Sequence, residues 1–140
     1  MIIMADVFSK EKRSWIMSRI RGRDTKPEML VRSVVHRMGF RFRLHCRELP
    51  GKPDIVLPRH KKVIFVHGCF WHGHKQCLRS RRPTTNTEFW NKKLDANIAR
   101  DKRVRMNLRR LGWKVLVVWE CETSDPDRLF AKLERFLHNG

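Results

Sequence analysis

The nine residues "WKVLVVWEC" (113–121) constrain the fold of this chain more than any other segment. They are almost wholly apolar and rich in valine, which is typical of a strand that is buried on both faces of a sheet. Two shorter apolar runs, "IVLP" (55–58) and "KKVIFVHG" (61–68), predict further strands, the second of them central. Because helices must cover such a sheet, we expect a layered α/β domain.

Helical patterns flank these strands. In "DTKPEMLVRSVVHRMG" (24–39), Thr25 and Glu28 have the spacing of a capping box, and an apolar stripe comprises Leu30, Val34 and Met38. Residues 87–112 predict one long helix, whose apolar stripe comprises Trp90, Leu94, Ile98, Val104, Leu108 and Leu111. Asp101 lies on that stripe, where a carboxylate needs a partner. That partner is either an imidazolium or a nearby Arg or Lys.

Two further segments complete the predicted order of elements. "FRFRLHC" (40–46) alternates apolar and polar residues, as a half-buried strand does, and we expect Cys46 to be a core residue in it. Residues 126–139 predict a closing amphipathic helix. Neither an internal repeat nor a linker interrupts the chain, so we predict a single domain over residues 1–140, in which helices flank a small mixed sheet.

The net charge of +18 indicates the class of partner, because Lys and Arg number 32 against 14 acids. A polyanion relieves such self-repulsion, and nucleic acid is the polyanion that we expect. A ribosome-associated protein and simple solubility charge are the alternatives. The basic residues 1–24 are interpreted as an arm that contacts DNA. No apolar run approaches the roughly 20 residues that span a bilayer, and we expect a cytoplasmic, membrane-free protein that associates with the nucleoid on DNA.

The segment "HGCFWHGHKQC" (67–77) combines metal-binding side chains with two adjacent aromatics. In a cytosolic chain, Cys and His that cluster in this way are more often metal ligands than disulfides. Free buried cysteines are the alternative. Phe70 and Trp71, in a polar loop, need a partner that covers them.

Asp54 follows Pro53 where a strand begins, and its carboxylate is well placed to bind a hard cation such as Mg²⁺. The alternative is an Asp that caps a turn. An acid on one strand with ligands on the next resembles the scaffold of the PD-(D/E)xK nucleases. Phe65 and His67 stand where that motif has its second acid and its lysine.

The resemblance to one family is more specific. The blocks "RDTKPE", "LPGKPDIV", "VIFVHGCFWHGH", "TEFW", "ARDKR" and "GWKVLVVWEC" occur in this order over roughly residues 5–122. They resemble the successive signature blocks of the very-short-patch-repair endonucleases. That resemblance implies a restriction-endonuclease-like core and an enzyme that nicks DNA on the 5′ side of the thymine of a T:G mismatch, which arises by deamination of 5-methylcytosine.

The resemblance also implies roles for single residues. Asp54 and the main-chain carbonyl of Val66 match the ligands of a catalytic Mg²⁺, and His72 matches the catalytic histidine. Glu28 matches an acid that supports the metal-bound waters, and Asp101 matches an aspartate that orients the histidine. For Glu28, the capping box is an alternative that is compatible with this role.

A structural zinc site is implied as well. Its ligands would be Cys69, His74, Cys77 and Cys121, a closed Cys₃His set. One more residue separates His74 from Cys77 than the family spacing has, which leaves open whether His74 or His72 faces the zinc. We assign His74, because His72 has the catalytic match.

The aromatics of the loop are the last part of the resemblance. Phe70, Trp71 and Trp90 match a trio that intercalates beside the mismatch, and unstacking costs least at a mispair. Met17, in the basic arm, is assigned to the minor-groove side. Core positions are the alternatives for Trp90 and Met17.

The predicted function is therefore a Mg²⁺-dependent, strand-specific endonuclease. The alternatives are a related nuclease of a restriction or mobile-element system that cuts unmismatched DNA, and a non-catalytic, zinc-stabilised DNA-binding module. The expected partner is double-stranded DNA with a T:G mismatch, bound by a monomer. A cytosine-5 DNA methyltransferase that sets the sequence context is a functional link, and mismatch-repair proteins are further candidate partners.

Overall fold

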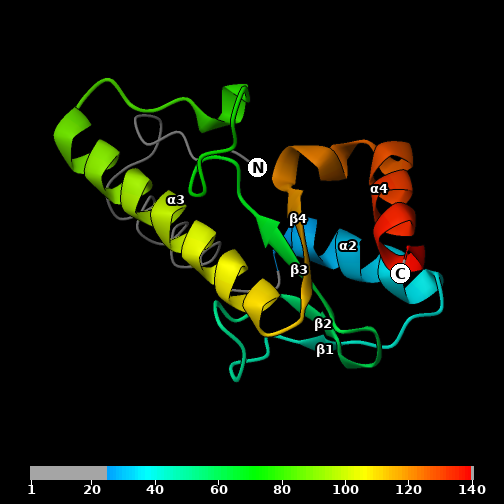
Figure 1. The fold of residues 1–140 in the computed structure, drawn as a ribbon. Helices are drawn as coiled ribbons and strands as arrows, with labels where there is room; N and C mark the ends of the chain where they lie inside the picture. Colours follow the sequence, from blue (N-terminus) through cyan, green and yellow to red (C-terminus); the bar gives the residue numbers. More distant parts are fainter. Residues whose placement is uncertain (1–24, 140) are drawn as a thin grey trace.

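The computed structural model describes residues 25–139, and a four-stranded mixed sheet forms its centre (Figure 1). The strands lie in chain order across the sheet: β1 (Arg43–Leu44), β2 (Ile55–Leu57), β3 (Lys62–His67) and β4 (Lys114–Trp119). The first three are antiparallel to one another, whereas β3 and β4 are parallel. The central position predicted for residues 61–68 is confirmed, because β3 pairs with a strand on each side.

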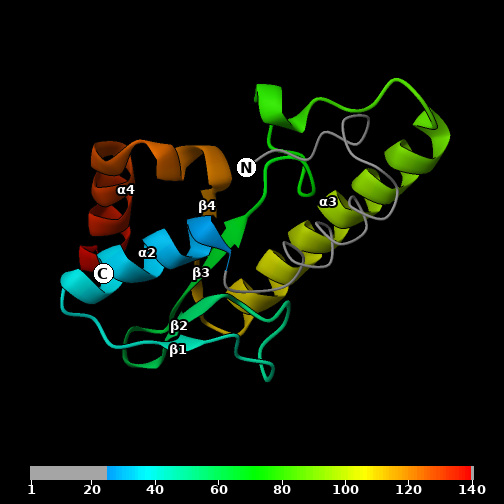
Figure 2. The same cartoon turned by 180° about the vertical axis from the view of Figure 1, so that it is seen from behind.

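Within residues 25–139, three helices cover the two faces of this sheet. They are α2 (Lys26–Arg37), α3 (Thr87–Arg110) and α4 (Pro126–His138). Both views place α3 on one face and α2 with α4 on the other (Figures 1 and 2). Thr25 caps α2, since its hydroxyl accepts the backbone N–H of Glu28 at 3.3 Å. Asp125 caps α4 in the same way, by accepting the N–H of Arg128.

The alternation of the strands divides the core into two clusters. Ile55, Leu57 and Ile64 point toward α2 and α4, whereas Val63 and Phe65 point toward α3. β4 contributes to both clusters, as predicted for a strand packed on two faces. In the described part of the chain β4 is nevertheless an edge strand, so its side chains other than Val118 stay partly exposed. Complete burial of this strand was the wrong expectation.

Strand pairing brings distant parts of the sequence to one end of the sheet. The antiparallel register pairs Ile55 with Ile64, which puts the residue before β2 beside the end of β3. The parallel register pairs His67 with Trp119. The short 3₁₀ segment Glu120–Ser124 therefore begins beside the loop that follows β3, a segment of His, Cys and Arg that leads to α3.

Three further expectations require correction. The strand predicted over residues 40–46 is reduced to two residues, because His45 adopts a φ of 50° that ends the ladder. Cys46 follows this strand instead of lying in it, and is half-buried. In α2, Val31 and Val35 are fully buried, whereas Leu30 of the predicted stripe is exposed.

Exposure also differs from the prediction along α3. Leu94 and Leu108 are buried, but Ile98 and Leu111 are 36% and 57% exposed. The N-terminal part of α3 extends past the sheet (Figure 1), so no strand covers it. Within the described residues no helix has the length and apolar character to cross a membrane.

Candidate active site and metal centre

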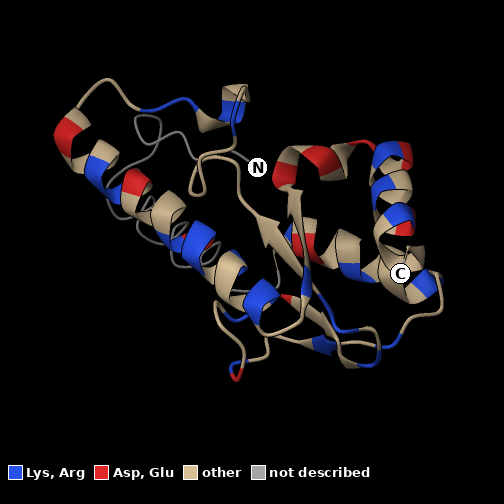
Figure 3. Ribbon diagram, viewed as in Figure 1, with Lys and Arg blue, Asp and Glu red and all other residues tan. Residues whose placement is uncertain are grey.

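One pocket collects four of the five residues that the sequence assigns to catalysis, all except Glu28. Its volume is about 680 Å³, and Asp54, Val66, His67, His72 and Asp101 line it. The basic side chains that also line it are Arg47, Lys52, Arg100 and Arg105. Lys and Arg recur along α3 (Figure 3), and Arg100, Val104 and Arg105 of this helix line the pocket beside Asp101. A pocket with two carboxylates, two imidazoles and a basic lining suits a phosphate group that is held together with a cation.

Asp54 is held by the backbone of the neighbouring strand. Its Oδ2 accepts the N–H of Val66 at 2.7 Å, which connects the start of β2 to the end of β3. Burial raises the pKa of Asp54 to about 6, and the nearby Glu28 adds to this, while the Val66 N–H and the charges of His45 and His72 oppose it. A buried carboxylate with a raised pKa gains much from a bound cation.

Glu28 is buried and faces the same region from α2. Its Oε2 binds the guanidinium Nη2 of Arg32 and lies 2.9 Å from the Nε2 of His45. Ligand atoms of Glu28, His45 and Asp54 all lie within 4.8 Å of one another. Thr25 supplies one half of a capping box, but the Glu28 carboxylate faces this cluster.

His72 and Asp101 form the second pair in the pocket. The Nδ1 of His72 lies 2.6 Å from the Oδ2 of Asp101. Burial opposes ionisation of Asp101, but the hydrogen bond from His72 and the charge of His72 outweigh it, so the pKa of Asp101 lies below its ordinary value. Of the two partners that the sequence left open, Asp101 therefore takes the imidazole. An ionised Asp101 makes Nδ1 the protonated ring atom and leaves Nε2 of His72 for proton exchange.

His67 packs against the His72–Asp101 pair. Its ring stacks on His72 with 3.8 Å between centroids and an interplanar angle of 8°. Burial lowers the pKa of His67 to about 3, with a further contribution from His72. His67 is therefore neutral near pH 7 and adds no positive charge beside His72. Its buried Nδ1 has no hydrogen-bond partner among residues 25–139.

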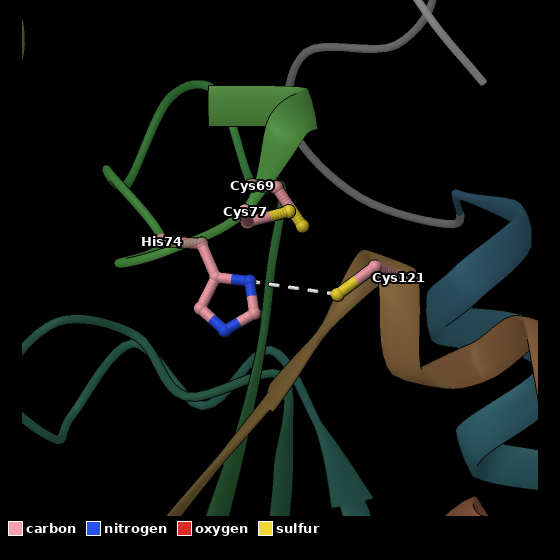
Figure 4. Close-up of side chains that lie close together, drawn as sticks. All are labelled: Cys69, His74, Cys77 and Cys121. Carbon is pink, nitrogen blue, oxygen red and sulfur yellow. Dashed lines mark hydrogen bonds between the residues drawn. The ribbon is translucent and has the colours of Figure 1, made fainter. Parts of the chain in front are cut away.

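The four residues assigned to zinc lie together at the end of the sheet. The ligand atoms of Cys69, His74, Cys77 and Cys121 are all within 4.8 Å of one another (Figure 4). The His74 Nδ1 lies 3.4 Å from the Cys121 sulfur. Burial raises the pKa of Cys69 to about 12, so its thiolate needs a cation. Three sulfurs and one imidazole nitrogen at this spacing fit a tetrahedral Zn²⁺.

The two histidines that the sequence left open for zinc lie in different clusters. His74 lies with the cysteines, whereas His72 lies with Asp101. Between His74 and Cys77 the chain turns at Gln76, whose φ of 55° is in the left-handed region.

Aromatic and polar contacts connect the cysteine cluster to the pocket. Trp119 stacks on His74, with centroids 4.2 Å apart and an interplanar angle of 11°, and contacts the edge of His67. The carboxylate of Glu120 accepts the N–H of Cys69 at 3.4 Å. A displacement of this cluster would therefore shift the ring of His67 and, through the stacking contact, the ring of His72.

The aromatic trio forms a half-buried cluster at the surface. Phe70 lies 5.1 Å from Trp71 and 5.5 Å from Trp90 between ring centroids, and the two tryptophans are 5.9 Å apart. Phe89, which the sequence analysis did not single out, contacts Trp90 edge-on and is 59% exposed. Met17, the fourth residue assigned to intercalation, lies outside the described residues.

Sequence reasoning missed His45 and Arg32, which lie beside Glu28. The loop between β1 and β2 turns back so that the His45 N–H donates to the carbonyl of Asp54 at 3.2 Å. A pattern of residue types gives no sign of this turn, and the sequence signal for His45 is its proximity to "PD", nine residues away. For Arg32 the signal is its i, i+4 spacing from Glu28.

Comparison with known proteins identifies the family of this chain. A family model described as DNA mismatch endonuclease Vsr matches residues 5–79. The Type II nicking enzyme V.XorIIP of Xanthomonas oryzae pv. oryzae is 48% identical over 134 residues, which cover 96% of this chain and 98% of that protein. The DNA mismatch endonuclease Vsr of Escherichia coli K12 is 44% identical over 126 residues, which cover 90% and 80%.

A solved structure supports the fold. The catalytic domain of the homing endonuclease I-Bth0305I aligns with a TM-score of 0.57 at 22% identity, covering 81% of this chain and 94% of that domain. This likeness confirms the predicted restriction-endonuclease-like core. With a family model that matches more than half of the chain, and relatives that cover nearly all of it, the chain belongs to the family of the DNA mismatch endonuclease Vsr and is a DNA endonuclease.

Proposed function

We propose that this chain is a Mg²⁺-dependent endonuclease that nicks double-stranded DNA on the 5′ side of the thymine in a T:G mismatch. One observation carries the proposal: Asp54 and the His72–Asp101 pair line a single pocket with basic side chains around it. The names of two relatives, a mismatch endonuclease and a nicking enzyme, support a substrate of this kind.

Asp54 and the main-chain carbonyl of Val66 would hold the Mg²⁺. An oxygen donor set and the raised pKa of Asp54 fit a hard cation at this position. When bound, Mg²⁺ activates water and neutralises charge on the scissile phosphate. Glu28, held by Arg32 and His45, would accept hydrogen bonds from water molecules in the pocket.

His72 would move protons during cleavage. Asp101 holds Nδ1 at 2.6 Å and thereby keeps Nε2 turned to the substrate, where it takes or gives a proton near neutral pH. His67 packs flat against the ring and restricts its rotation. Because His67 is neutral, this contact does not disfavour the imidazolium that forms on His72.

The remaining assignments concern DNA. The zinc would fix the loop at Cys69, His74, Cys77 and Cys121, so that the segment between these ligands presents Phe70 and Trp71 to the mismatch. Trp90 would complete the wedge from α3, while residues 1–24, with Met17, would contact the other side of the duplex. A cytosine-5 methyltransferase would set the sequence context, mismatch-repair proteins would act on the nicked product, and the protein would work as a monomer.

A nicking assay on matched duplexes tests the proposal. Duplexes with a T:G mismatch in varied contexts are compared with fully paired duplexes of the same sequences, with and without Mg²⁺. We expect a single nick 5′ of the mismatched thymine only with Mg²⁺, lost in Asp54→Asn and kept in Asp127→Asn, a change at an exposed position of α4. Efficient cutting of paired DNA would favour a restriction-type nuclease instead.

A further inference from the structure

His45 lies at the proposed cation site and has a basic ring nitrogen. Its Nε2 lies 2.9 Å from Glu28 Oε2, and the ligand atoms of His45, Glu28 and Asp54 are within 4.8 Å of one another. The charge of His45 also acts on Asp54, whose carboxyl pKa it lowers. A nitrogen atom therefore joins two carboxylates at a site whose other proposed donors are oxygens.

The backbone holds His45 in this position. Its φ of 50° lies in the left-handed region, which non-glycine residues adopt rarely. Its N–H donates to the carbonyl of Asp54 at 3.2 Å. The turn and this hydrogen bond together keep the imidazole-bearing residue beside a proposed metal ligand.

We propose, on the basis of the proposed function, that His45 is a nitrogen ligand of the catalytic cation and lets this site accept Mn²⁺ and related transition-metal ions as well as Mg²⁺. Oxygen donors alone suit Mg²⁺, whereas imidazole nitrogen strengthens binding of Mn²⁺ and later first-row metals. Asp54 remains the carboxylate that either ion requires.

Arg32 lies against the same ring nitrogen. Its Nη2 lies 3.0 Å from His45 Nε2 and also binds Glu28. In the tautomer that leaves Nε2 unprotonated, the guanidinium donates to this nitrogen and takes the place that a cation would occupy. On cation binding, Arg32 retains its ion pair with the carboxylate of Glu28, four residues away on the same helix, and loses its contact with the ring of His45.

Pulsed EPR of bound Mn²⁺ tests this assignment, because a directly bound imidazole gives ¹⁴N coupling. The full-length, zinc-loaded protein is compared with His45→Asn, which tolerates the left-handed backbone but has no basic nitrogen. His36→Gln, at an exposed position of α2, is the matched control. Thermal denaturation verifies folding, and His45→Gln is a second variant.

We expect ¹⁴N coupling in the wild type and in His36→Gln, and its loss in both His45 variants. The variants should bind Mn²⁺ about tenfold more weakly, with a change of less than about threefold for Mg²⁺. Coupling that persists without His45 would overturn the inference and point to His67 and His72, which form a neighbouring cluster with Asp101. Nicking by Asp54→Asn would refute the proposed function, whatever the EPR result.

Discussion

Replacing Asp54 by Asn should stabilise the protein while abolishing its proposed activity. Burial raises the pKa of this carboxyl from 3.8 to about 6 in the folded state. Between these pH values the folded protein binds more protons than the unfolded chain, so the wild type loses stability as the pH rises. The difference of about two between the pKa values corresponds to about 3 kcal/mol, which is fully expressed above pH 6.

The amide of Asn avoids this cost and still accepts the N–H of Val66, the contact that Asp54 makes at 2.7 Å. Chemical denaturation at a fixed free zinc concentration, without other divalent ions, measures the difference from pH 4 to 8. We expect equal stability near pH 4 and an advantage of about 3 kcal/mol for the variant at pH 7. Added Mg²⁺ should stabilise only the wild type. A difference that is independent of pH, or a less stable variant at pH 7, would refute the reasoning.

Three further predictions concern the zinc cluster, the catalytic pair and a buried lysine. Cys121→Ser should lose bound zinc and lower the melting temperature, as measured by metal analysis and calorimetry; full zinc content would exclude Cys121 as a ligand. Asp101→Asn should slow single-turnover nicking about 100-fold or more with little change in DNA affinity, and an unchanged rate would remove Asp101 from the mechanism. Lys62→Met should cost roughly 2–4 kcal/mol, because the buried ammonium donates to the carbonyls of Phe136, Leu137 and Asn139 at the end of α4. Nicking kinetics below the melting temperature should be unaffected, and a normal unfolding curve would show that these bonds contribute little.

Much of the fold is readable from local patterns. The valine-rich runs became β3 and β4, and Thr25 and Asp125 cap their helices, because apolar periodicity and capping depend on residues close in sequence. Exposure was predicted less well. Ile98 and Leu30 lie on apolar stripes but are exposed, since burial depends on which other elements cover a helix face, and the stripe itself does not specify this.

The candidate site also combines features that depend on residues close in sequence with features that depend on the tertiary fold. Three of the four cluster residues lie in one short loop, so their proximity follows from spacing, and the β3–β4 register adds Cys121. His45 reaches Asp54 only through a left-handed residue and a returning loop. Neither feature produces a periodic pattern of residue types, so the sequence analysis did not identify His45.

Anomalous diffraction from crystals grown with zinc and soaked in Mn²⁺ tests most directly whether one metal holds the loop and a different one takes part in cleavage. Data at the two absorption edges should place zinc among Cys69, His74, Cys77 and Cys121, and manganese at Asp54. A single shared position, or manganese bound away from Asp54, would contradict the account.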